Sequence, residues 1–217
     1  GALSADALTT GICNVAIGTN ALGAATTGCR NVAIGELALG GAVVTGDFNV
    51  ALGYASADAI TSGAQNVAIG RLALSAATTG CRNIALGYLA MGAGITTGIN
   101  NIALGTTSLD ALTSGICNIA IGTDALGAST TGCRNVAIGD LALGAGVVTG
   151  FNNVALGTTA MDALTSGCYN VALGFNALGA ATTGASNIGI GTNAGDAVVA
   201  QSGTINIGVN ANQTGAN

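Results

Sequence analysis

The sequence lacks several residue types on which much protein chemistry depends. Its 217 residues include no His, no Pro and no Trp, and all four of its basic residues are arginines. Without His, the side chain that most often carries acid–base catalysis near neutral pH is missing. With a net charge of −5, a nucleic-acid partner is not expected. No apolar run reaches the ~18 residues of a membrane-spanning helix, so no membrane span is expected either.

Aromatic and charged residues are also scarce, at 3% and 6% of the chain, although half of the residues are hydrophobic. The apolar residues are mainly Ala, Val, Ile and Leu, accompanied by 37 Gly, and such small side chains suit a narrow interior. No pair of carboxylates and no Gly-rich phosphate loop is placed for chemistry. We therefore expect no enzyme activity, no catalytic residues, no cofactor and no metal.

A short phrase recurs along almost the whole chain. It reads Asn-[Val/Ile]-[Ala/Gly]-[Ile/Leu/Val], and Gly follows in all but the last copy. Among every three consecutive spacings between copies of the phrase, one is slightly longer than the other two, and the last spacing is the longest. The phrase begins at Asn14, Asn31, Asn49, Asn66, Asn83, Asn101, Asn118, Asn135, Asn153, Asn170, Asn187 and Asn206. A short, near-fixed period is typical of a solenoid, in which each coil is buried by its neighbours.

Every third coil is equivalent, because Asn14, Asn66, Asn118 and Asn170 head units of matching sequence. We predict an all-β parallel β-solenoid, a β-helix or β-roll of about 12 coils, in which a three-coil, 52-residue cassette is repeated four times. Residues 1–200 would form the repeat domain, and residues 201–217 a divergent C-terminal coil or tail.

Each coil reads as two short strands separated by turns. In the first coil Val15 and Ile17 alternate with Ala16, which is the period of a strand. We expect Val and Ile to point inward. Gly18 would form a corner, and a second short strand would carry Leu22. The longer coils contain an extra residue near Val43, Ile95 and Val147, where we expect a bulge or a widened corner.

Two columns of equivalent residues follow from this stacking. The Asn residues would form a hydrogen-bonded ladder along the rod. If Val and Ile point inward, the central strand residue points outward and forms an apolar stripe of the kind that marks a contact surface. This stripe comprises Ala16, Ala33, Ala51, Ala68, Ala85, Ala103, Ala120, Ala137, Ala155 and Ala172, followed by Gly189 and Gly208. The alternative is that it faces a second layer of the same coil.

Two further columns lie at the turns. A Thr or Ser precedes the turn Gly in most coils, as at Thr45 and Thr97, and its hydroxyl can cap the turn or bond along the ladder. A regular Thr array also allows ice binding as a minor alternative. The residue after the corner Gly varies most, and Arg71 falls between Tyr54 and Tyr88 on consecutive coils. There a cation–π stack is expected.

The six cysteines follow the cassette. Cys13 and Cys29 bracket one coil, as do Cys117 and Cys133. We predict a disulfide within each pair, closing a loop around that coil and pointing to an oxidising, extracellular compartment. Buried thiols without partners are the alternative. The remaining two residues, Cys81 and Cys168, would be free or intermolecular.

The segment NVAIGTNALGAATTGCRNVAIG from residue 14 resembles the N-x-x-AIG-x-x-AL-x-x-x-TTG repeats of phage tail-fibre-like proteins and bacterial surface fibres. It is also similar to the head repeats of trimeric autotransporter adhesins, although the coils here are longer. The resemblance covers residues 1–210. It implies a parallel β-roll or β-helix, display at the cell surface or on a virion, frequent trimerisation and a role in attachment.

These patterns together predict a structural protein. We expect the building block of an extracellular fibre or filament, which assembles with copies of itself laterally through the Ala stripe and head to tail through sheet edges that lack Pro or charged blocking residues. The alternative is a trimeric adhesin or phage tail-fibre segment that binds a surface receptor or glycan.

Overall fold

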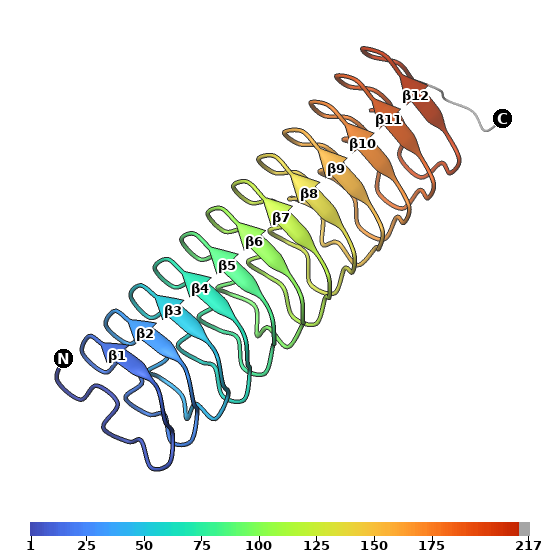
Figure 1. Cartoon of the computed structure of the whole chain (residues 1–217). Coiled ribbons are helices and arrows are strands. Elements are labelled where there is room, and N and C mark those ends of the chain that lie inside the picture. Colours follow the sequence, from blue (N-terminus) through green and yellow to red (C-terminus); the bar gives the residue numbers. More distant parts are fainter. Residues whose placement is uncertain (213–217) are drawn as a thin grey trace.

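The computed structural model describes residues 1–212, which form a long rod of stacked coils (Figure 1). Each coil contributes one short strand, and the strands form a single parallel sheet in sequence order. They are β1 (Val15–Ile17), β2 (Val32–Ile34), β3 (Val50–Leu52), β4 (Val67–Ile69), β5 (Ile84–Leu86), β6 (Ile102–Leu104), β7 (Ile119–Ile121), β8 (Val136–Ile138), β9 (Val154–Leu156), β10 (Val171–Leu173), β11 (Ile188–Ile190) and β12 (Ile205–Ile207). The predicted all-β parallel solenoid is confirmed.

The strands form where β-branched residues recur, and they pair with no shift between coils. Val15 pairs with Val32, and Ala16 with Ala33. Gly ends each strand at a corner with a backbone that L side chains rarely adopt, as at Gly35 with φ of 132°. A Cβ on Gly35 would also lie 2.5 Å from the carbonyl oxygen of Gly53 in the next coil. The corner column therefore requires Gly for two independent reasons.

The predicted second strand does not form in any described coil. Asn20 and Leu22 instead have left-handed backbone angles, with φ of 55° and 51°, and the segment is a series of turns. Equivalent residues repeat these angles in the following coils. Backbone bonds still link the turns between coils, and the N–H of Leu22 donates to the carbonyl oxygen of Ala38 at 3.0 Å. The left-handed residues turn the chain sharply, and the side chain of Leu22 is buried inside the rod.

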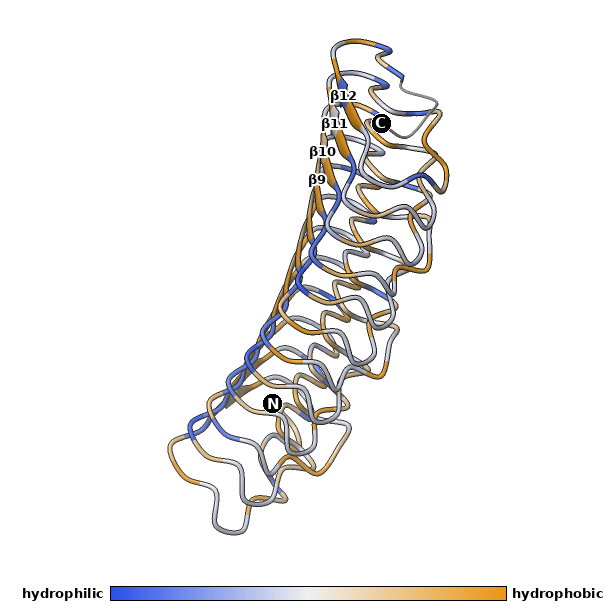
Figure 2. Cartoon of the chain, turned by 90° about the vertical axis from the view of Figure 1, so that its right-hand side faces the viewer, coloured by the Kyte–Doolittle hydropathy of each residue, from blue (hydrophilic) through white to orange (hydrophobic). Residues whose placement is uncertain are grey.

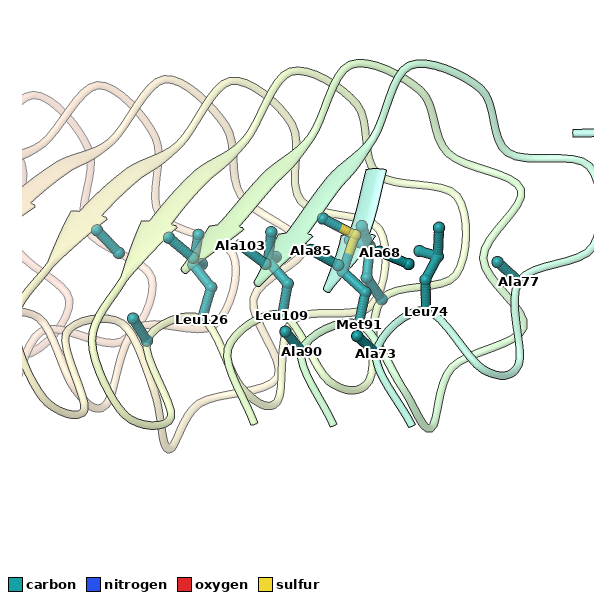
Figure 3. Close-up of a cluster of buried hydrophobic side chains, with 14 of the residues drawn as sticks. Ala68, Ala73, Leu74, Ala77, Ala85, Ala90, Met91, Ala103, Leu109 and Leu126 are labelled. Atoms are coloured by element: carbon teal, nitrogen blue, oxygen red, sulfur yellow. The ribbon is translucent and has the colours of Figure 1, made fainter. Parts of the chain in front are cut away.

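The core is a thin layer between the sheet and these turns. Ala68 and Ala85 project inward from β4 and β5, and Leu74 and Met91 approach them from the opposite wall (Figure 3). All four side chains are fully buried. Most coils thus place one small residue opposite one large residue, which leaves little room for a second large side chain from the sheet; Ala57 in the β3 coil and Gly195 in the β11 coil are the exceptions.

The Asn ladder is confirmed for residues 14 to 187. The Oδ1 atom of Asn118 accepts a hydrogen bond from the backbone N–H of Asn135 at 3.0 Å, and its amide nitrogen donates to the Gly132 carbonyl at 2.7 Å. The same pattern repeats along the column, whose members from Asn31 onward are buried. Each Asn therefore ties its coil to the next through both ends of its amide group.

The ladder ends differently from the prediction. Asn206 was expected to continue it, but it lies at the centre of β12 and pairs with Gly189 in the central strand column. Thr204 takes the ladder position, and its backbone N–H donates to Oδ1 of Asn187 at 2.9 Å. The reason is that the last coil has the same length as the coil before it, which places Gly208 in the corner column with φ of 122°. Residues 201–212 therefore continue the stack, while 213–217 lie outside the described residues.

The longer coils widen at the predicted place, and Val43, Ile95 and Val147 are exposed there. An Asp from the following coil supports the widened turn: Oδ1 of Asp110 accepts a hydrogen bond from the backbone N–H of Ala93 at 2.9 Å. Burial raises the pKa of the Asp110 carboxyl, which the backbone bonds from Ala93 and Gly92 partly oppose. Asp162 repeats this contact in the next cassette, where its Oδ1 accepts a hydrogen bond from the backbone N–H of Ala145 at 2.9 Å.

Threonine hydroxyls bond along the stack, as expected. Oγ1 of Thr45 donates to the carbonyl oxygen of Thr61 at 3.3 Å, and Oγ1 of Thr97 donates to that of Thr113 at 3.3 Å. These bonds link the Thr turns of successive coils.

Candidate interaction surface

The outer face of the sheet is the most unusual surface of the rod. The first and third residues of every strand point outward, and all of them are Val, Ile or Leu. They are half-buried or exposed, with Ile17 56% exposed and Ile207 66%. Figure 2 shows the strands as a hydrophobic band along one side of the rod. We call these residues of β1–β12 the aliphatic face.

The expected Ala stripe is therefore wrong in direction. Ala33, Ala51, Ala68, Ala85, Ala103, Ala120, Ala137, Ala155 and Ala172 are all fully buried, and Ala16 in the first coil is half-buried. Gly189 is buried in the same column, whereas Gly208 belongs to the corner column. In most coils the inner space admits only a small side chain here, because the opposite wall already supplies Leu or Met. The alternative, that the stripe packs within its own coil, is correct.

Two columns border the aliphatic face. The leading edge consists of the residue before each ladder position: Cys13, Arg30, Phe48, Gln65, Arg82, Asn100, Cys117, Arg134, Asn152, Tyr169, Ser186 and Gly203. The trailing edge consists of the residue after each corner Gly: Thr19, Glu36, Tyr54, Arg71, Tyr88, Thr106, Thr123, Asp140, Thr158, Phe175, Thr192 and Val209. Almost all of these residues are exposed. They give an aliphatic surface a polar and aromatic rim.

The predicted cation–π stack is present on the trailing edge. The guanidinium of Arg71 lies 5.8 Å from the ring centre of Tyr54 and 5.5 Å from that of Tyr88. On the leading edge, Arg30 lies 5.3 Å from the ring centre of Phe48. These stacks hold long cationic side chains beside the aliphatic face.

The predicted disulfides do not form: all six cysteines lie within the described residues, and all are free thiols. Cys13 stacks in register with Arg30, because the N–H of Arg30 donates to the carbonyl oxygen of Ile12, one residue before Cys13. Cys29 therefore stacks over Ile12, and the same one-residue offset separates Cys117 from Cys133. The left-handed backbone at Cys13 and Cys117, with φ of 60° and 59°, turns the chain sharply between these neighbouring positions. Cys81 and Cys168 are also unpaired, as expected.

Residues 1–212 show no other candidate site. They form no pocket, and they bring together no group of three His, Cys, Asp or Glu residues suited to a metal ion. Within the same residues no helix has the length and hydrophobicity to cross a membrane.

Comparison with known proteins places the chain in no family: no family model, no curated protein and no solved structure matches it. The parallel β-solenoid fold is thus the level at which the chain is classified, and its function has to be inferred from its surfaces.

Proposed function

We propose that this protein is a structural building block of an extracellular fibre, in which copies of the rod associate side by side through the aliphatic face. The observation that carries the proposal is the composition of that face. Two outward side chains from each strand are aliphatic along the whole sheet, without one polar or charged substitution in β1–β12. Monomeric proteins rarely expose continuous apolar patches above a few hundred Å².

The dimensions of the face support a stable contact. The steps from β1 to β12 at ~4.8 Å give a length of about 53 Å, and the width from leading to trailing edge is at most about 20 Å. The product approaches about 1,000 Å² for each copy, against the roughly 800 Å² per partner of a standard interface. An apolar centre with Tyr, Phe and Arg at its rim also matches the composition of protein interfaces.

The extracellular location is supported by the similarity of the repeat to those of surface fibres and tail fibres. The proposed mechanism is mechanical: the ladder bonds stiffen each rod, and lateral association joins rods into a thicker shaft.

The experiment is a comparison of two lysine variants in solution. Ile69→Lys with Ile121→Lys places charge on the aliphatic face, whereas Thr79→Lys with Thr131→Lys places it on exposed turn positions. Sedimentation and light scattering should show multi-copy assemblies for the natural protein and the turn variant, and single rods for the face variant. A natural protein that stays monomeric at every concentration would refute the proposal.

A further inference from the structure

The two edges of the aliphatic face vary together from coil to coil. From β1 to β11, wherever the trailing edge has Thr, the leading edge has Cys, Asn or Ser. Wherever the trailing edge has a charged or aromatic residue, the leading edge has Arg, Phe, Tyr or Gln. The matched positions are Cys13 with Thr19, Arg30 with Glu36, Phe48 with Tyr54, Gln65 with Arg71, Arg82 with Tyr88, Asn100 with Thr106, Cys117 with Thr123, Arg134 with Asp140, Asn152 with Thr158, Tyr169 with Phe175, and Ser186 with Thr192. In the last coil the pair is Gly203 with Val209.

Contact within one rod does not explain this matching. The extended strand separates the two edges in each coil, so they lie on opposite sides of the face, up to about 20 Å apart. The contacts that edge residues make within the rod run along one edge, as between Arg30 and Phe48.

Copying of the cassette does not explain it either. Cys13 and Gln65 hold equivalent positions in successive cassettes, as do their counterparts Thr19 and Arg71. Both edges have changed between these cassettes, and they have changed together. A physical contact between the edges would account for the joint change.

Association of parallel copies supplies that contact. When copies are related by rotation about an axis parallel to the stack, the leading edge of one copy meets the trailing edge of the next at the same coil. Arg30 then meets Glu36 of the second copy, and Arg134 meets Asp140 of the second copy. Both acids on the trailing edge gain an Arg, and Phe48 meets an aromatic partner in Tyr54 of the second copy.

An antiparallel pair fits the charged edge residues poorly. It would place leading edge against leading edge with the coil order reversed. With the two rods fully overlapped, Arg82 would meet Arg134 of the second copy, and Glu36 would lose a cationic partner. Like charges brought together at an interface are unfavourable.

We propose that the partner of the aliphatic face is a second copy of this chain that lies parallel and in coil-for-coil register. This inference rests on the proposed function and adds the direction and alignment of the copies. The edges select the alignment, because a shift by one coil would take the Arg away from both acids. Glu36 would then meet Cys13 or Phe48, and Asp140 would meet Cys117 or Asn152. A pair and a ring of three form the same edge contacts.

Cross-linking tests the direction. In a background with Ser at the six natural cysteines, Phe48→Cys with Tyr54→Cys should form disulfides between copies on mild oxidation. The two positions are too distant to join within one copy. The matched control is Phe48→Cys with Tyr169→Cys, because an antiparallel pair would bring these two together. Cross-links in the control in place of the first variant would overturn the inference while leaving lateral association intact; a monomeric protein would overturn both.

Charge exchange tests the edge pairing itself. Arg30→Glu with Arg134→Glu places acids opposite acids and should weaken association by about 100-fold. Adding Glu36→Arg and Asp140→Arg to the same chain restores each pair with reversed polarity and should return the affinity to within about tenfold of the natural value. If the fourfold variant associates no better than the double variant, the edges do not meet as proposed.

Discussion

The two faces of the sheet reverse the usual distribution of side-chain size. The inward column holds Ala, with one carbon in its side chain, and the outward columns hold Val, Ile and Leu. Both faces are apolar, so hydrophobicity alone does not decide which one is inside. The opposite wall decides it, because Leu or Met already fills the thin interior. In a narrow solenoid the inner position is limited by volume, and the large apolar residues of the strands lie on the outer face.

The largest loss of unfolding free energy is expected when a buried Asn of the ladder is replaced. Replacing Asn118 by Ala removes the acceptor of the Asn135 N–H and the donor to the Gly132 carbonyl. Both groups would remain buried without these bonds, which should cost about 2–5 kcal/mol of unfolding free energy. Denaturant unfolding measures the loss. Thr131→Ala, on an exposed turn, is the control and should stay within about 0.5 kcal/mol of the natural protein. Equal losses in both variants would contradict the ladder's role.

Enlarging an inward residue of the sheet should cause the next largest loss of stability. Ala120→Leu adds volume to the filled interior and should destabilise the rod by about 1–3 kcal/mol. Ile121→Leu, its neighbour on the outward face, conserves volume and should cost less than about 1 kcal/mol. Thermal unfolding of both variants compares them directly. If Ala120→Leu were tolerated as well as Ile121→Leu, the interior would have room that the packed core denies.

The smallest effect concerns the carboxyls at the widened turns. Burial raises the pKa of Asp58 and Asp110 above the ordinary value of 3.8. The folded state then holds these protons to higher pH than the unfolded state, so their contribution favours folding below that ordinary value and is lost as pH rises through the raised values. The unfolding midpoint should fall slightly over this window. Asp58→Asn with Asp110→Asn should flatten that trend, and an unchanged slope would contradict it.

The period-two pattern of Val15, Ala16 and Ile17 predicted the strand but not its orientation. Alternation states that neighbours face opposite ways, and it leaves open which of the two faces is inside. The orientation of the strand follows from Leu22 and its large equivalents, because these side chains occupy the interior and leave space only for Ala. A volume estimate for one coil would have shown that Val and Ile could not join them there.

The alignment of the last coil with the coil before it explains why Thr204, and not Asn206, holds the last ladder position. One coil length beyond Asn187 lies Thr204, and the same length beyond Gly191 lies Gly208, so the Gly column contained the correct alignment of the last coil. The left-handed angles at Leu22 had no such signal, because Leu seldom adopts them outside a context that enforces it. The stack of Arg71 between two tyrosines was predictable because it depends only on equivalent positions in consecutive coils.

Because all coils stack in the same register, the number of coils in the rod can change without a change of fold. Gain or loss of one cassette would change the rod by three coils, or about 14 Å, and the Asn ladder and the corner Gly column would continue without a break. Recombination between cassettes could therefore change the length of the rod while the Asn and Gly columns stay intact. In the proposed assembly, each leading-edge residue meets the trailing-edge residue of the same coil in the next copy. If one copy gained or lost a cassette, the coils beyond that cassette would no longer meet their equivalents. The proposed fibre would therefore favour chains of equal length.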